Sequence, residues 1–222
     1  MIVRLLSFIC SNFIICSVKN DTILKNFIVF EGLDGAGTTT QAKILAEKLK
    51  NDNKKVFLDA EPTPSPIGEL IRETYLKKKA STTMLALALL YCADRENHLN
   101  NIDNGIKKRL SEGGIVISDR YLYSSIAYQG VNINPLLIEN LNNFESPEYV
   151  IYIDTPVDEC LKRIDKREGE KELFEHKSFL EKTKQGFDRV FSSLPQGVKL
   201  LHLNGLESID MLSWRIAQFI KA

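Results

Sequence analysis

The sequence predicts an α/β protein built on one five-stranded parallel sheet with helices on both faces. Short apolar runs, typical of buried strands, alternate with longer amphipathic stretches, typical of helices, along most of the chain. The first clear apolar run, Phe27 to Phe30, leads through a glycine-rich turn into a helical stretch. Because strands that are joined through helices run parallel, we expect all five strands to share one direction.

The turn after Phe30 fits a phosphate-binding loop, with one exception. The pattern is G-x-x-x-x-G-K-[ST], and Gly32, Gly37 and Thr39 occupy three of its fixed positions. Thr38 stands where the pattern has lysine. Backbone N–H groups of such a loop, with a helix N-terminus behind them, bind phosphate. A glycine-rich strand-to-helix turn without a ligand is the alternative interpretation.

Length and composition indicate one globular domain. The chain has 222 residues, of which 44% are hydrophobic and 26% charged, and its formal net charge is zero. This charge balance gives no reason to expect a nucleic acid or a membrane as the main partner. The four cysteines are scattered without metal-site spacing, so we expect reduced thiols in a cytosolic protein.

The first 26 residues do not share the alternating pattern. Leu5 to Val18 is mostly apolar and could be read as a signal peptide, but it has no convincing cleavage site. It is also short for a membrane span, which needs about 20 residues. We therefore expect residues 1–26 to be an atypical extension or a start assigned too early, and residues 27–222 to form the domain.

The remaining elements follow in order from the same patterns. We expect further strands at 54–59, 113–121, 149–154 and 199–203, and helices at 67–79, 82–93, 175–191 and 208–221. The helix over 82–93 is apolar on all sides, which predicts that it is buried. Asp94 and Arg95 at its end then need partners, either each other or neighbouring helices. Asp119 and Arg120 end the third strand, on the side of the sheet where α/β proteins bind ligands.

Five separate motifs together resemble the thymidylate kinase family. They are FIVFEGLDG at 27–35, EP at 61–62, IGELIR at 67–72, ADR at 93–95 and DRYLYSSIAYQG at 119–130. The resemblance extends from Phe27 to about Lys221. It implies a phosphate-loop NTPase fold and a cytoplasmic kinase, usually a homodimer, that phosphorylates dTMP with ATP and Mg²⁺ in dTTP biosynthesis.

The resemblance also implies where the nucleotides and the metal bind. ATP phosphates would lie against Gly32, Leu33, Asp34, Gly35, Ala36, Gly37, Thr38 and Thr39. The Thr39 hydroxyl would bind Mg²⁺, and Asp119 and Glu61 would help to position the ion through its waters, since hard cations prefer oxygen ligands. The dTMP pocket would contain Arg72, Tyr91, Arg95, Arg120, Ser124, Ser125, Tyr128 and Gln129.

Individual roles within the dTMP pocket follow from the same resemblance. Arg72 and Arg120 would bind the phosphate, because one guanidinium can donate two parallel hydrogen bonds to two phosphate oxygens. Arg95 would hydrogen-bond the thymine edge, and Tyr91, one helical turn earlier, would stack on the ring. Ser124, Ser125 and Gln129 would complete the base pocket. Tyr128 would crowd the 2′ position of the sugar, and Asp34 would contact the 3′-hydroxyl and orient nearby arginines.

Two departures from the family pattern bear on catalysis. Thr38 replaces the lysine, and Gly35 stands where one subgroup carries an arginine. We therefore expect the catalytic cations in a short mobile lid at Lys162–Lys171, with Arg163, Lys166 and Arg167 joining Asp34 and Arg120 as catalytic residues. Two alternatives remain: a nucleotide-binding protein with impaired catalysis, suggested by Thr38, and a kinase for another deoxynucleotide.

Overall fold

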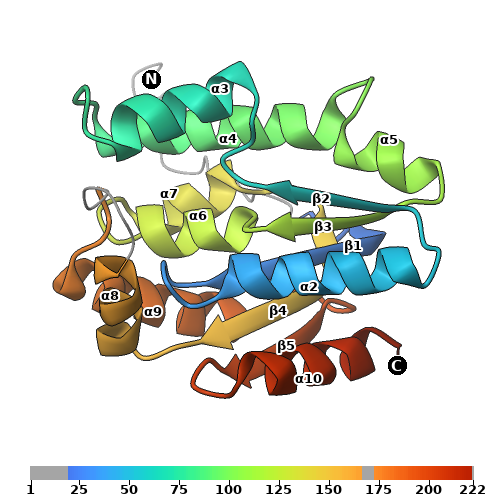
Figure 1. Cartoon of the computed structure of the whole chain (residues 1–222). Helices are drawn as coiled ribbons and strands as arrows, with labels where there is room; N and C mark the ends of the chain where they lie inside the picture. The colour runs from blue at the N-terminus through green and yellow to red at the C-terminus, as the bar shows by residue number, and fades with distance from the viewer. Residues whose placement is uncertain (1–19, 167–172, 222) are drawn as a thin grey trace, which may run out of the picture.

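The computed structural model describes residues 20–166 and 173–221. Its centre is a five-stranded sheet in which every neighbouring pair is parallel, in the order β2-β3-β1-β4-β5 (Figure 1). The strands are β1 Ile23–Gly32, β2 Val56–Ala60, β3 Ile115–Asp119, β4 Ser146–Asp154 and β5 Lys199–Asn204. The predicted α/β class and five-stranded parallel sheet are confirmed. Because β1 is central, the loop that follows it opens at the middle of the sheet.

Helices cover the sheet on both sides. On one face α2 (Thr38–Asn51) and α10 (Ile209–Lys221) pack against each other, and on the other face α6 (Leu122–Gln129) packs against α9 (Lys177–Phe191) (Figure 1). The other helices are α3 Pro66–Glu69, α4 Met84–Asn100, α5 Ile106–Ser111, α7 Pro135–Leu141 and α8 Val157–Asp165. Fully buried apolar side chains from the central strands form the core, among them Val29, Phe30, Ile117 and Ile151. No described helix has the length and apolar character needed to cross a bilayer.

Strand β1 begins earlier than its apolar pattern indicates. It starts at Ile23 instead of Phe27, because Ile23 pairs with Ser146 at the start of β4. The backbone N–H of Ser146 also donates to the Thr22 carbonyl at 2.9 Å. Residues 20–26 thus belong to the described fold. Most of their side chains are polar, so the apolar pattern that predicts strands does not include them. Residues 1–19 lie outside the described part of the chain.

The helices that follow β2 differ most from expectation. The predicted helix at 67–79 is a short α3 that continues into a wider π-helical segment, η1 (Leu70–Leu76). Helix α4 continues two turns beyond the predicted end, so Asp94 and Arg95 lie inside it. The expectation that this helix is buried on all sides is wrong, since Leu85 is 42% and Leu89 48% exposed.

Candidate active site

The glycine-rich turn forms a loop whose backbone conformation requires its glycines. Gly35 and Gly37 have φ angles of 81° and 106°, which side chains rarely tolerate. A Cβ at Gly35 would also lie 2.7 Å from the carbonyl oxygen of Cys160. The loop opens into a pocket lined by residues 33–41 together with Arg120 and Arg163. The residues predicted to bind ATP phosphates therefore lie together, with Gly32 at the end of β1.

The Thr39 hydroxyl and the Asp119 carboxylate lie together at the edge of this pocket. Asp119 ends β3, next to β1 in the sheet, and its Oδ2 accepts a hydrogen bond from the Thr39 hydroxyl. The second carboxylate oxygen, Oδ1, is buried, and it has no hydrogen-bond partner within the described residues. These hard oxygen donors suit Mg²⁺, which needs only one or two protein ligands when phosphate oxygens and waters complete its shell.

A second pocket lies beside the first and contains all eight residues that were predicted to bind dTMP. It is lined by Arg72, Tyr91, Arg95, Arg120, Ser124, Ser125, Tyr128 and Gln129, together with Asp34, Glu61, Pro62, Leu76, Tyr121 and Phe174. Sequence reasoning missed Leu76 and Phe174, because nothing in their local pattern separates them from ordinary core residues. The buried Oε1 of Gln129 has no partner in the described part of the chain, so an acceptor is available in this pocket.

Arg120 lies between the two pockets in a strained backbone conformation. Its φ angle is 75°, a region that costs about 1–3 kcal/mol for a residue with a side chain. The guanidinium donates to the carbonyl of Gly32 at 2.9 Å, to Ser124 Oγ at 2.9 Å and to Asp34 Oδ1 at 2.6 Å. Tyr128 donates its hydroxyl to the other Asp34 oxygen at 3.2 Å. These contacts hold Arg120 and Asp34 where the pockets meet.

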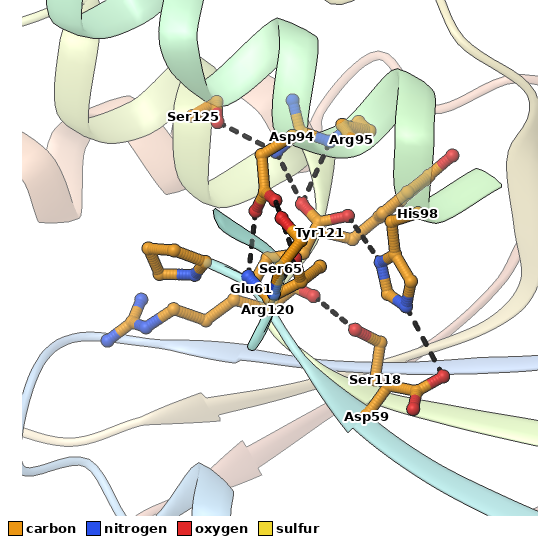
Figure 2. A network of polar contacts seen from close by, with 12 residues as sticks. Asp59, Glu61, Ser65, Asp94, Arg95, His98, Ser118, Arg120, Tyr121 and Ser125 are labelled. Atoms are coloured by element: carbon orange, nitrogen blue, oxygen red, sulfur yellow. Dashed lines mark hydrogen bonds and ion pairs between the residues drawn. The ribbon is translucent and has the colours of Figure 1, made fainter. Parts of the chain in front are cut away.

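Asp94 holds the loop after β2, whose backbone carbonyls accept hydrogen bonds from Arg72. It accepts hydrogen bonds from the Thr63 backbone N–H at 2.7 Å, the Thr63 hydroxyl at 2.5 Å and the Ser65 hydroxyl at 2.8 Å (Figure 2). Arg72 donates to the carbonyls of Pro62 and Thr63 on the same loop. Asp94 and Arg95, whose partners the sequence left open, do not pair with each other. Asp94 pairs with the loop after β2, and Arg95 pairs with Glu61 on that loop and with neighbouring helices through Ser125 and Asn142.

Comparisons with known proteins identify the family. The family model described as thymidylate kinase matches residues 30–209. "Putative thymidylate kinase" from Treponema pallidum (strain Nichols) is 39% identical over 203 residues, which cover 90% of this chain and 96% of that protein. "Probable thymidylate kinase" from Methanococcus maripaludis (strain C7 / ATCC BAA-1331) is 40% identical, covering 88% and 91%. The protein of the same name from Thermococcus kodakarensis (strain ATCC BAA-918 / JCM 12380 / KOD1) is 37% identical, covering 88% and 97%.

The chain belongs to the thymidylate kinase family. Its members are enzymes that phosphorylate dTMP, so the predicted family and enzyme class are confirmed.

Glu61 has a different environment from the one expected of a thymidylate kinase metal ligand. Its Oε2 accepts from Arg95 at 2.7 Å, its Oε1 lies 2.9 Å from His98 Nδ1, and its side chain is 3% exposed. Both oxygens therefore have cationic partners. The expected role of Glu61 in positioning Mg²⁺ through its waters stays a prediction. His98 was missed, since a single histidine at the polar end of an apolar helix carries no distinctive signal.

The expected lid cations separate into three cases. Arg163 lies on α8, where its guanidinium donates to the carbonyls of Gly35 at 3.4 Å, Ala36 at 3.3 Å and Gly205 at 3.1 Å. Its guanidinium thus lies against the phosphate loop, and its expected part in a mobile lid stays a prediction. Lys166 is exposed just after α8, and Arg167 lies outside the described residues.

Glu31, which precedes the phosphate loop, is a buried carboxyl group that sequence reasoning did not single out as functional. It accepts hydrogen bonds from the backbone N–H groups of Tyr121 at 3.0 Å and Ser124 at 3.2 Å, and also contacts the Ser124 hydroxyl. Burial raises the pKa of Glu31 from 4.5 to about 8, although the hydrogen bonds from Ser124 and the charge of Arg120 oppose this. Glu31 thereby joins β1 to the start of α6, which carries much of the second pocket.

The raised pKa of Glu31 predicts a pH dependence of stability. Between pH 4.5 and about 8 the folded protein holds a proton that the unfolded chain has released, so the free energy of unfolding should fall as pH rises through this window. Urea unfolding followed by circular dichroism at pH 5, 6.5 and 8 measures this fall. Glu31→Gln should show a smaller fall than the wild type, and the exposed Glu47→Gln should match the wild type. Equal slopes for Glu31→Gln and the wild type would contradict the shifted pKa.

Proposed function

We propose that the chain transfers the γ-phosphoryl group of ATP to dTMP at the junction of the two pockets. The observation that supports this is that Asp34 and Arg120 line both pockets. Phosphoryl transfer requires the donor and acceptor phosphates to be held in line and their charge neutralised. An arginine shared by the two pockets can contact both phosphates during transfer.

On the ATP side, the backbone N–H groups of residues 32–39 would bind the phosphates at the start of α2. Thr39 and Asp119 would hold Mg²⁺, which would neutralise phosphate charge and orient the ATP oxygens. Thr38 supplies no charge where a phosphate-loop lysine normally contacts the β- and γ-phosphates. We assign the missing charge to Arg163, whose guanidinium lies against the same loop, with Lys166 and Arg167 as further candidates.

On the dTMP side, Arg72 and Arg120 would bind the phosphate and Asp34 the 3′-hydroxyl. Arg95 would read the base edge and Tyr91 would stack on the ring, while Ser124, Ser125 and Tyr128 would enclose the base and sugar. The unpartnered Oε1 of Gln129 suits the ring N–H of thymine, because it can only accept.

The exposed leucines of α4 support a homodimer. Leu85 and Leu89 lie one turn apart on the same face, and burying such a pair in an interface is favourable. We therefore place the contact between two copies of this chain on α4. We also propose a cytoplasmic location and small nucleotides as partners. The zero formal net charge gives no reason to expect a nucleic acid or a membrane among them.

An assay of ADP release tests the proposed reaction. With ATP and Mg²⁺, we expect phosphorylation of dTMP in preference to dUMP, dGMP and thymidine. Arg120→Ala should remain folded and lose at least about tenfold in rate, since it removes a charge-assisted phosphate contact. A wild-type protein that binds both nucleotides but releases no ADP would instead indicate the impaired-catalysis alternative.

Combining Arg163 variants with Thr38→Lys tests whether Arg163 replaces the missing lysine. If Arg163 supplies the charge of the missing lysine, Arg163→Ala should lower kcat by roughly 100-fold while changing the KM for dTMP much less. Thr38→Lys should recover part of this loss, and Arg163→Lys, which keeps the charge, should lose less than Arg163→Ala. A double-mutant cycle measures the coupling, and strict additivity would refute the compensation.

The dimer proposal predicts that a charge on α4 separates the subunits. Leu89→Asp places a carboxylate in the proposed interface, so it should shift the mass in sedimentation-equilibrium measurements from two chains toward one. Met211→Asp, at a comparably exposed apolar residue on α10, should leave the mass unchanged. A wild type that sediments as a monomer, or a Leu89→Asp variant that stays dimeric, would contradict the assignment.

A further inference from the structure

A line of charged side chains runs from the end of β2 to Arg95 on α4 (Figure 2), and two of its members, Glu61 and Arg95, line the second pocket. His98 lies between two carboxylates, with Nε2 3.2 Å from Asp59 Oδ2 and Nδ1 2.9 Å from Glu61 Oε1. The other Glu61 oxygen accepts from Arg95 Nε at 3.0 Å and from Nη2 at 2.7 Å. Asp59, His98, Glu61 and Arg95 thus form one continuous chain of contacts.

The orientation of the Arg95 guanidinium is held by hydrogen bonds to three side chains. Glu61 engages Nε and Nη2, Ser125 Oγ accepts from Nη2 at 2.8 Å, and Asn142 Oδ1 accepts from Nη1. These partners come from the loop after β2, from α6 and from the end of α7. The Glu61 carboxylate provides two of the four hydrogen bonds, so its orientation has the largest influence on the guanidinium plane.

Water cannot easily substitute for a lost member of this chain of contacts. The side chains of Arg95, Glu61 and His98 are 1%, 3% and 7% exposed. A buried carboxylate oxygen that loses its donor must find another one nearby. Without His98, Glu61 Oε1 would turn toward the one remaining guanidinium N–H, on Nη1, and pull Arg95 out of its present orientation.

We propose that His98 is a positioning residue that sets base selection, because it fixes Glu61 and Glu61 fixes Arg95. The proposal rests on the assignment of Arg95 as the group that reads the base edge. Arginine only donates hydrogen bonds. A correctly oriented Arg95 therefore favours thymine, which presents a carbonyl at position 4, over cytosine, which presents an amino group there.

The charge state of His98 agrees with this role. Burial by itself would lower its pKa, but hydrogen bonds to Asp59 and Glu61 raise the pKa to about 9. At neutral pH both ring nitrogens then carry protons, and each can donate to one carboxylate.

Arg109 provides a matched control within the same cluster. Its Nη1 contacts Asp59 Oδ2, the same oxygen that His98 contacts, but no described contact joins it to Glu61. Removing Arg109 should therefore weaken the buried charge cluster without releasing Glu61. A purely structural role of the cluster would make the two variants behave alike.

The test compares His98→Ala, His98→Gln and Arg109→Gln in the full chain, by steady-state kinetics with dTMP and dCMP and by calorimetric binding of both nucleotides. His98→Ala should raise the KM and Kd for dTMP roughly 10- to 100-fold, the effect of losing one charge-assisted hydrogen bond at a buried site. The ratio of kcat/KM for dTMP over dCMP should fall, and the KM for ATP should stay unchanged. His98→Gln, which keeps one donor, should retain part of the selectivity.

Arg109→Gln should lower the melting temperature but keep the wild-type preference for dTMP over dCMP. The proposal is overturned if His98→Ala folds and binds dTMP with wild-type affinity and selectivity, or if Arg109→Gln loses as much selectivity as His98→Ala. The calorimetric Kd values for dTMP and dCMP can be measured even if the protein does not turn over. A wild type that binds dTMP without phosphorylating it would refute the proposed reaction and leave the positioning role testable.

Discussion

The contact of Arg120 with the end of β1 and with Asp34 joins the two halves of the site. Arg120 follows β3, yet its guanidinium reaches the Gly32 carbonyl and the Asp34 carboxylate across the neighbouring strand. This requires a left-handed backbone at a residue with a side chain, which is stable only where the surroundings enforce it. The parallel pairing of β1 with β3 and the buried Glu31 contacts to Tyr121 and Ser124 provide those surroundings. Both pockets depend on this junction.

Helix α4 supplies the second constraint, since it organises a loop that cannot form regular structure itself. The segment after β2 contains three prolines, which remove backbone donors and leave few internal hydrogen bonds. Asp94 takes up the donors of Thr63 and Ser65, while Arg95 and His98 hold Glu61. One face of one helix thus fixes the loop, and the loop carbonyls fix Arg72.

The missing lysine changes how charge is distributed around the phosphate loop. Thr38 is nearly buried at the start of α2 and can offer one hydroxyl but no charge. Arg163 approaches the loop from α8, the helix that follows β4, and donates to the carbonyls of Gly35 and Ala36. A cation docked in this way is already in place before nucleotides bind, whereas a lid cation must be brought in by closure.

The sequence by itself determined the sheet and the phosphate loop, and the resemblance of its motifs to the thymidylate kinase family implied most members of the second pocket. Apolar runs mark buried strands because each must exclude water on both faces, and glycines at 35 and 37 mark a loop with positive φ. The DRYLYSSIAYQG segment placed several pocket residues on one helix, so their proximity needed no tertiary information. These signals are local, and a linear sequence displays local signals directly.

Tertiary structure alone decided which charged groups face one another. Glu61 was expected at the metal and faces Arg95 and His98, Arg163 was expected in a lid and lies against the phosphate loop, and α4 keeps two leucines at its surface. Ion-pair partners 34 to 37 residues apart depend on how a helix is rotated against a loop. The apolar pattern does not specify that rotation, because it is set by packing between elements that are distant in the chain.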